Sequence, residues 1–320
     1  MLLVRADGIG DALACTPLIA ALRDAGHTVG AILGPSNGAI FARHTFSAVH
    51  VLERIAWPRH GSTPESRSSA LAQVKAAGYD VALVASEELD AYAFASEAGI
   101  ERRVGYVNGF AKPFKTLRVR ALLTKALVRP ASASAAREHE VETLFRLGAG
   151  LSSETVPIRD AARLRPLVLD EPVAAHGAIV LQISRKLARE GLDLAAYAAL
   201  ATELGTRGHR VLAVGEDAAD VAEVARESGA EARSALSVED WKAAIAGARA
   251  LVTPDSGAAH VAGMLGVPCV DCFPPGRTTS FDIVRWRPWA APQRTLVLDP
   301  AREPGAVRAQ IFAALLELIP

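Results

Sequence analysis

Short apolar runs alternate with stretches of helical spacing along the first half of the chain. An apolar run bounded by turn residues predicts a buried strand, and apolar positions three and four residues apart predict a helix. Strands are predicted at residues 1–6, 27–33, 49–52 and 81–85. A helix over residues 66–77 is predicted to stop at Gly78, since glycine is the usual residue after a helix C-terminus.

Residues 151–177 contain several prolines and are predicted to form a linker, in which an edge strand is also possible. A second alternating series follows this linker. Strands are predicted at residues 178–183, 210–214, 250–253 and 267–273, and helices at 194–204, 218–227, 238–246 and 304–319. The alternation is typical of parallel α/β sheets. Two α/β halves of similar size joined by a linker imply a cleft between them, where ligands usually bind.

The composition narrows the class of protein. The 320 residues are about twice the usual domain size of roughly 100–200 residues. The 35 basic and 35 acidic side chains cancel, so the chain as a whole does not attract nucleic acid. Three cysteines are too few for a disulfide framework, and no apolar run reaches membrane-spanning length. We expect no secretory signal, because no basic segment precedes an apolar core in the first residues. We expect a soluble, cytoplasmic protein with no nucleic-acid partner.

A glycine turn follows the first predicted strand. Gly8 and Gly10 begin the G-x-G-x-x-G pattern of dinucleotide-binding proteins, but Leu13 occupies the third glycine position. Loss of the third glycine weakens a dehydrogenase interpretation. The turn still allows a ligand to approach the backbone closely at the carboxyl edge of the strand.

Asp11 lies near the start of the next helix. The helix begins either just after Asp11, with a kink at Pro17, or later, with Thr16 as N-cap and Pro17 as the first helical residue. Asp11 is either a capping residue or a general base at the edge of the sheet, where nearby helix amides would keep its carboxylate ionised.

The strongest local motif is residues 251–268, in which a strand leads through Asp-Ser-Gly into a helix of small residues. Asp255, Ser256 and Gly257 would present backbone amides at a helix N-terminus, a favourable site for phosphate. His260, one turn later, either faces the same anion or is a partly buried structural histidine. Asp255 and Ser256 are alternatively simple N-capping residues.

The motif resembles the nucleotide-sugar motif of glycosyltransferase family 9, the lipopolysaccharide heptosyltransferases, which reads Asp-Ser-Gly-x-x-His. Residues 5–17 resemble the family's opening strand with its Gly-Asp turn. The end of the family's first domain resembles residues 103–106 together with 139–142 and 147–148. More weakly, residues 215–216 resemble a Gly-Glu pair in the family's second domain. The likeness covers essentially the whole chain in the right order.

The resemblance implies the GT-B architecture, with two Rossmann-like parallel-sheet domains that face each other across a cleft. We expect an N-terminal acceptor domain at residues 1–165 and a C-terminal nucleotide-sugar domain at residues 166–302. We expect a final helix, residues 303–320, to pack back on the N-terminal domain.

The resemblance also implies the reaction. The family suggests an inverting, metal-independent transfer of a sugar, heptose from ADP-heptose, to a lipopolysaccharide core or other glycan. We expect no cofactor, since the nucleotide sugar is a co-substrate, and a cytoplasmic enzyme that works at the inner face of the inner membrane. The alternative is a non-catalytic nucleotide-sugar-binding protein derived from the same family.

Site residues are carried over by position. Asp11 matches the catalytic base. Donor binding is assigned to Asp255, Ser256, Gly257, His260 and Gly215, and acceptor binding to Gly8, Gly10 and Arg103.

Two stretches of the second domain depart from the family pattern. The usual Lys before Trp-Pro is replaced by residues 184–193, which contain no Trp-Pro pair. Arg185, Lys186 and Arg189 all remain candidates for the cation on the donor phosphate. Pro274 stands where the family usually has glycine, which reduces backbone freedom beside the nucleotide.

Residues 102–129 form a basic stretch without a single acidic residue. We assign Lys112, Lys115 and Arg118 to acceptor binding. The stretch, interleaved with aromatic and apolar residues, is either a solvated basic face or a surface, on a mobile loop or short helix, for an anionic glycolipid and membrane.

The sequence offers no conventional metal site. No Asp-x-Asp triplet occurs, and the Cys-x-x-Cys pair at Cys269 and Cys272 lies in a predicted buried strand without a second pair. We therefore expect cations and helix amides, rather than a metal, to neutralise the leaving group.

Overall fold

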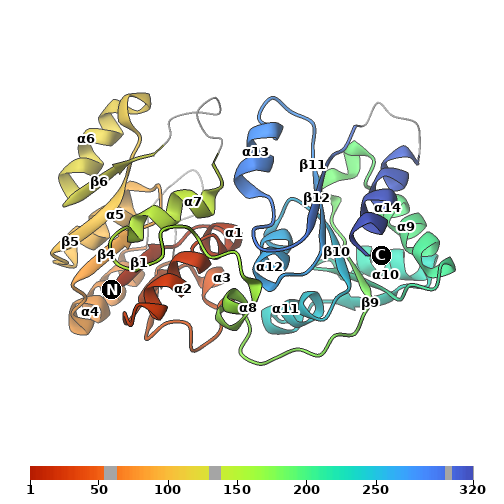
Figure 1. Ribbon diagram of the computed structural model, residues 1–320, viewed down its shortest axis with the longest axis horizontal. Coiled ribbons are helices and arrows are strands. Elements are labelled where there is room, and N and C mark those ends of the chain that lie inside the picture. Colours follow the sequence, from red (N-terminus) through yellow and green to blue (C-terminus); the bar gives the residue numbers. More distant parts are fainter. Residues whose placement is uncertain (54–62, 130–137, 300–304, 320) are drawn as a thin grey trace. The chain divides into compact units, whose positions relative to one another are not determined.

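The computed structural model describes residues 1–53, 63–129, 138–299 and 305–319. The chain divides into two compact units, Met1–Arg159 and Asp160–Pro320, and each unit is built on one parallel sheet (Figure 1). The division falls just before α8 (Ala161–Leu164), inside the predicted linker. Residues 151–177 are all described and form short helical turns but no strand.

The first sheet has the order β3-β2-β1-β4-β5-β6, and all neighbouring strands pair in parallel. Its strands are β3 (Val49–Val51), β2 (Gly30–Leu33), β1 (Leu2–Arg5), β4 (Val81–Val84), β5 (Arg102–Val107) and β6 (Lys125–Val128). The three strands β1, β2 and β4 are buried along their whole length, so continuous apolar runs identify them in the sequence. The pattern does not identify β5 and β6, because charged residues open both of them and β6 is a partly exposed edge strand.

Helices lie on both faces of this sheet (Figure 1). They are α1 (Ile9–Leu13), α2 (Thr16–Asp24), α3 (Pro35–Gly38), α4 (Pro64–Ala77), α5 (Leu89–Glu97), α6 (Pro113–Leu122) and α7 (Glu140–Phe145). Tyr92 and Phe94 of α5 are fully buried in a core with Leu2 and Val4 of β1. Gly78 ends α4 in the left-handed conformation, as the sequence predicts.

The second sheet repeats the path of the first, with the order β12-β11-β10-β7-β8-β9 and parallel pairing throughout. Its strands are β12 (Gln293–Val297), β11 (Cys269–Phe273), β10 (Ala250–Pro254), β7 (Ile179–Gln182), β8 (Val211–Gly215) and β9 (Glu231–Ser234). The pattern does not identify β9 and β12, since they are edge strands and carry polar side chains.

The helices of the second unit include α9 (Leu194–Thr206), α10 (Ala218–Ser228), α11 (Val238–Ala246), α12 (Gly257–Leu265), α13 (Thr279–Trp286) and α14 (Ala306–Leu318). Ile311 and Leu315 of α14 belong to the same buried cluster as Leu200 and Leu204 of α9. The terminal helix therefore packs in the second unit, and the expectation that residues 303–320 pack back on the N-terminal domain stays a prediction. Residues 303, 304 and 320 lie outside the described residues.

Each sheet reverses its strand order at one point. The chain winds outwards from β1 through β2 to β3 and then adds β4 on the other side of β1. The second unit does the same from β7, with β10 on the far side. In open parallel sheets, ligands bind outside the carboxyl ends of the two strands that flank such a switch point. The fold thus singles out the ends of β1 and β4, and of β7 and β10.

No helix among the described residues combines the length and the apolar character needed to cross a bilayer.

Candidate functional site

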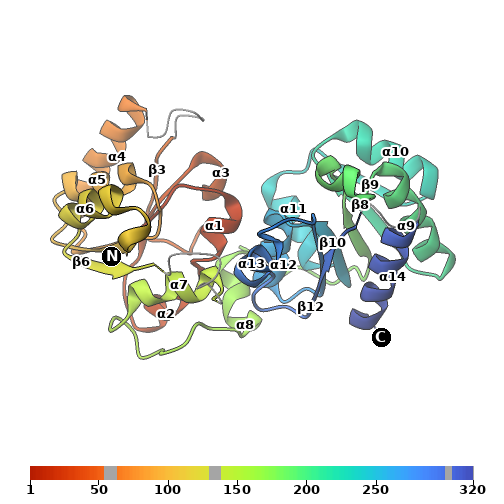
Figure 2. The same cartoon turned by 90° about the horizontal axis from the view of Figure 1, so that it is seen from above.

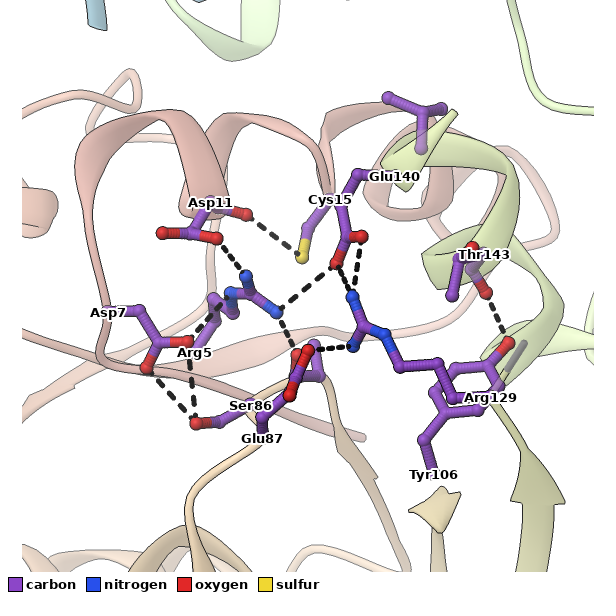
Figure 3. A network of polar contacts seen from close by, with 12 residues as sticks. Arg5, Asp7, Asp11, Cys15, Ser86, Glu87, Tyr106, Arg129, Glu140 and Thr143 are labelled. Carbon is purple, nitrogen blue, oxygen red and sulfur yellow. Dashed lines mark hydrogen bonds and ion pairs between the residues drawn. The ribbon is translucent and has the colours of Figure 1, made fainter. Parts of the chain in front are cut away.

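A buried arginine organises the switch point of the first unit (Figure 3). Arg5, the last residue of β1, is 2% exposed. Its guanidinium donates to the backbone oxygen of Ala85, just after β4, and to Oδ1 of Asp11, and its Nε lies 3.3 Å from Oδ2 of Asp7. Arg5 therefore joins the carboxyl ends of both central strands and holds two carboxylates there.

Asp11 is the partly exposed member of this group. It lies in α1, which begins before it, while α2 begins at Thr16. The structure thus has two consecutive helices, and neither start that the sequence allows is correct, because α1 begins before Asp11 and the N-cap residue of α2 is Cys15 rather than Thr16. The second carboxylate oxygen of Asp11 accepts from the amide of Gly8 at 3.3 Å, and a Cβ at position 8 would lie 3.1 Å from that oxygen. Glycine at position 8 therefore lets the carboxylate fold closely over the turn.

A second charged layer extends the network. Glu140 of α7, 1% exposed as a side chain, accepts two hydrogen bonds of 2.5 Å from Arg129 and lies 3.9 Å from the Arg5 guanidinium. Arg129 also lies 3.0 Å from Glu87, which follows β4. Ser86 donates to Asp7 at 3.1 Å. Two arginines and four carboxylates thus alternate in sign around one edge of the sheet (Figure 3).

These charges stabilise one another in a place where a lone charge would be costly. Burial opposes the positive charge of Arg5, but Asp11 and Asp7 raise its pKa above the ordinary value. Burial raises the pKa of the nearby Cys15 thiol to about 12, so this cysteine is a neutral packing residue rather than a nucleophile.

Most side-chain contacts of this network could not be predicted from the sequence. Arg5 and Tyr106 belong to matched stretches, but nothing local indicates that Arg5 would contact Asp11 or that Tyr106 would donate to the backbone oxygen of Thr143 in α7. One signal was available for Arg5: it is the charged residue in an otherwise apolar first strand. A buried arginine requires acidic partners, and Asp7 and Asp11 are the nearest in sequence.

A pocket of about 470 Å³ lies beside this network at the start of α5. It is lined by Glu87, Glu88, Leu89, Asp90, Lys112 and Lys115. Lys112 and Lys115, two of the four basic residues assigned to the acceptor, therefore meet a row of carboxylates. Arg118 is exposed and is not among the lining residues. Burial lowers the pKa of Lys115, with Lys112 and Arg129 acting in the same direction and Glu87 opposing them.

Arg103 does not belong to this site. It lies near the amino end of β5, at the opposite edge of the sheet, and its guanidinium donates to the backbone oxygens of Leu122 and Ile100. These hydrogen bonds attach the end of α6 to the sheet, and a contact of Arg103 with an acceptor stays a prediction. Gly8 and Gly10 do lie at the switch point, and their contact with an acceptor stays a prediction.

The switch point of the second unit holds a lysine beside the Asp-Ser-Gly turn. Lys186 follows β7, and its Nζ donates to the backbone oxygen of Asp255 and lies 3.4 Å from Oδ2 of the same residue. The Lys186 side chain is half-exposed, so one side of the ammonium group is available to a ligand. Asp255 directly follows β10, so the contact between Lys186 and Asp255 joins the segments that leave the carboxyl ends of β7 and β10.

The two arginines near Lys186 lie in different surroundings. Arg185 makes a bidentate pair with Asp220 of α10, with distances of 2.8 and 2.6 Å. The hydrogen bond from Arg185 lowers the pKa of Asp220. Arg189 is exposed one turn later and has no described contact with Asp255. Of the three cations that the sequence leaves open, only Lys186 contacts the Asp-Ser-Gly turn in the described structure.

The helix after that turn has an uncapped start. Ser256 is the N-cap residue of α12, but its hydroxyl pairs with Thr253 at 3.0 Å and does not accept from the helix amides. This contradicts the simple capping role for Ser256. The amides that open α12 from Gly257 onwards are therefore not satisfied by the N-cap side chain, which suits an anionic ligand.

His260 and Gly215 have structural surroundings of their own. His260 is 7% exposed and packs edge-to-face on Trp286 of α13, with ring centroids 5.8 Å apart. A Cβ at Gly215, which ends β8, would lie 3.0 Å from the backbone oxygen of Ile183. Glycine is needed there for close packing against the end of β7, the strand that leads to Lys186. Donor contacts of both residues stay predictions.

A buried acid lies beneath this site. Asp271 of β11 is fully buried, and neither of its oxygens has a hydrogen-bond partner among the described residues. Burial and the charge of Asp255 raise its pKa well above the ordinary value, although Lys186 opposes the shift. Because the folded-state pKa exceeds the unfolded one, the unfolded chain ionises first as pH rises.

We expect Asp271→Asn to make the protein more stable at neutral pH. Asparagine keeps the shape but has no proton to lose, so the gain in unfolding temperature should be small near pH 4 and grow towards pH 8. Thermal unfolding measured across this range checks the prediction, with the exposed Asp24→Asn as control. A wild-type protein that is the more stable of the two at pH 8 would contradict it.

The described residues contain no group of three or more His, Cys, Asp or Glu side chains that could hold a metal ion. Cys269 and Cys272 are free and buried, and burial raises the pKa of both thiols.

Comparisons with known proteins cover both units. The sequence model of glycosyltransferase family 9 (heptosyltransferase) matches residues 67–314. A comparison with curated protein sequences finds no match.

Solved structures share the fold over the whole chain. The E. coli heptosyltransferase WaaC with ADP has a TM-score of 0.77 at 16% identity, with 99% of each chain covered. The E. coli ADP-heptose LPS heptosyltransferase II has a TM-score of 0.67 at 18% identity, with 99% of this chain and 98% of that chain covered. A family 9 glycosyltransferase from Veillonella parvula has a TM-score of 0.73 at 15% identity, with 99% and 96% covered. The predicted GT-B class, with two Rossmann-like parallel-sheet domains, is confirmed.

Proposed function

Because this chain belongs to glycosyltransferase family 9, the heptosyltransferase family, and is thus a glycosyltransferase, we propose that it transfers heptose from ADP-heptose to a lipopolysaccharide-core or related glycan acceptor. We further propose that the transfer inverts the anomeric configuration and needs no metal. The structural neighbour with ADP supports an adenine nucleotide as the donor's leaving group.

The observation that carries this proposal is the pair of charged groups at the two switch points, a carboxylate in the first unit and an ammonium group in the second. One holds a partly exposed carboxylate, Asp11, fixed by Arg5 and the Gly8 amide. The other holds a half-exposed ammonium group, Lys186, beside the uncapped start of α12. A base and an anion site are the two elements that a direct displacement on a sugar diphosphate requires.

In the proposed reaction, Asp11 takes the proton from an acceptor hydroxyl while that oxygen attacks the anomeric carbon of the donor. The new C–O bond forms as the bond from the anomeric carbon to the diphosphate oxygen breaks, and the electron pair leaves with the nucleoside diphosphate. The amides that open α12 and the Lys186 ammonium group stabilise its developing charge. A single displacement of this kind inverts the configuration at the anomeric carbon.

The pocket at the start of α5 supports an acceptor that carries both hydroxyl and acidic groups. Its carboxylates, Glu87, Glu88 and Asp90, accept hydrogen bonds from sugar hydroxyls, and Lys112 and Lys115 bind anionic substituents. We propose that the acceptor is such an acidic sugar on a glycolipid, and that the reaction takes place in the cytoplasm at the inner membrane.

Chelation tests the metal-free part of the proposal. We expect the initial rate of heptose transfer, measured by mass spectrometry of the product, to be the same in EDTA and in Mg²⁺. Lys186 and the α12 amides supply the positive field that a metal would otherwise supply. A rate that EDTA abolishes and Mg²⁺ or Mn²⁺ restores would refute metal independence.

The same assay tests the donor. Heptose transfer from ADP-heptose is expected, together with a higher unfolding temperature in ADP than in UDP or GDP, since a ligand selective for the native state stabilises it. Stabilisation by ADP-heptose without transfer to any glycan would favour a binding protein instead.

A further inference from the structure

The outward side of α6 carries large apolar side chains in contact with water. Phe110, in the turn before α6, is fully exposed at 102%, Phe114 is 85% exposed and Leu117 is 71% exposed. No other phenylalanine among the described residues is exposed. Val128, at the end of β6, is 68% exposed and lies close to Gly109 in the same turn. Clustered apolar exposure of this kind marks an interaction site.

The helical spacing of α6 places these residues on one side. Phe114, Leu117, Arg118 and Ala121 follow at intervals of three and four residues, and all four are exposed. Val119, on the opposite side, is the buried residue of the helix. That side packs towards α5 (Figure 2). We call the exposed set Phe110, Phe114, Leu117 and Arg118 the α6 outer face.

The charge around the α6 outer face has one sign. No acidic residue occurs between Arg102 and Arg129, although the whole chain has zero net charge. Arg118 lies within the face and the exposed Arg120 beside it. Neither arginine forms an ion pair within the part of the chain that the structure describes. Two lysines of the stretch differ, because Lys112 and Lys115 share their pocket with carboxylates.

Exposed apolar side chains together with arginines indicate which kind of partner the α6 outer face binds. The core of a protein–protein interface has few charged residues, whereas Arg118 lies among the apolar side chains of the α6 outer face. A nucleic-acid surface would need cations and stacking rings but has no use for an exposed leucine. Aromatic and aliphatic side chains flanked by arginine fit the headgroup boundary of an anionic bilayer, where apolar groups enter the acyl region and cations meet lipid phosphates.

We infer that the α6 outer face inserts Phe110, Phe114 and Leu117 into the surface of an anionic membrane, with Arg118 and Arg120 bound to lipid headgroups. This inference does not depend on the glycosyl transfer. If the proposed function also holds, Lys112, which lines the pocket and directly precedes α6, places the pocket next to the membrane surface that carries a lipid-borne acceptor.

Vesicle binding without any sugar substrate tests the inference separately from the reaction. The wild-type chain should co-sediment with vesicles of phosphatidylglycerol and phosphatidylcholine, but not with phosphatidylcholine alone. The triple variant Phe110→Ser, Phe114→Ser, Leu117→Ser should lose at least about tenfold in partition coefficient, because three apolar side chains no longer leave water. The double variant Arg118→Glu, Arg120→Glu should lose a similar factor and the dependence on salt.

Two matched controls alter other exposed positions. Val156→Ser removes an exposed apolar side chain elsewhere in the first unit, and Arg226→Glu reverses an exposed charge in the second. Both should bind as the wild type does. Unchanged unfolding temperatures show that the variants are folded, which is expected because every altered side chain faces water.

Several outcomes would overturn the inference. These are no binding of the wild type to anionic vesicles, equal binding to phosphatidylcholine, and undiminished binding of either multiple variant. Binding of single-stranded RNA that the same substitutions abolish, without vesicle binding, would assign the surface to nucleic acid instead.

Discussion

Asp11→Asn is expected to reduce kcat for glycosyl transfer by roughly 10²–10⁴-fold, the range associated with loss of a general base. Asparagine retains one oxygen that can accept from Arg5, but its NH2 group cannot replace Oδ2 as the acceptor for the Gly8 amide. The Arg5 contact should hold the side chain in place, and an unfolding temperature near that of the wild type shows that the fold is kept. Asparagine cannot accept the proton of the acceptor hydroxyl. Single-turnover rates at saturating donor measure the loss, and nucleotide affinity should remain that of the wild type.

Asp7→Asn is the matched comparison. Asp7 also lies beside Arg5, but it accepts from Ser86 at 3.1 Å and its side chain is 18% exposed against 31% for Asp11. The Asp7 variant should therefore lose much less activity than the Asp11 variant. A larger loss for Asp7→Asn, or near wild-type turnover for Asp11→Asn, would assign the base elsewhere.

Lys186→Met is expected to have the second large effect. Removing one preorganised positive group from a developing anion typically costs about 10²-fold in rate. Methionine retains most of the aliphatic length, so the local packing next to Asp255 should survive. We expect a fall of this order in kcat/KM for the nucleotide sugar, together with weaker binding of the nucleoside diphosphate by calorimetry.

Arg185→Met separates this effect from a general loss of charge. Arg185 is the neighbouring cation, but its guanidinium is held in a bidentate pair by Asp220. We expect donor affinity within about threefold of the wild type, because a surface ion pair contributes little. If Arg185→Met impairs donor binding more than Lys186→Met does, Arg185 is the donor cation.

The sequence alone determines the repeated α/β plan and most of its central strands. Buried parallel strands such as β1, β4 and β10 are continuous apolar runs, and such runs are a local property of the chain. The Asp-Ser-Gly turn before α12 and the glycine turn at Asp11 are local for the same reason. Each signal lies within about one turn or one strand of the residues that it describes.

Contacts between distant segments are decided by the tertiary structure. Arg5 meets Ala85 because the sheet order puts β1 beside β4. Arg129 meets Glu140, and Tyr106 meets Thr143, because the fold brings α7 to the ends of β5 and β6. The strands β5, β6, β9 and β12 likewise depend on their neighbours, since the polar residues that they carry do not distinguish strand from loop.

Orientation is the other property that only the tertiary structure decides. Both Arg185 and Lys186 are cationic and adjacent in the sequence, so the sequence does not distinguish them. In the structure, Arg185 pairs with Asp220, whereas Lys186 donates to the backbone oxygen of Asp255. The basic stretch is uniform in sequence, but α6 divides it, with Lys115 in the pocket and Arg118 on the outer face. Residue types and spacings are local, whereas the partner of a long charged side chain is set by whichever distant segment the fold brings within its reach.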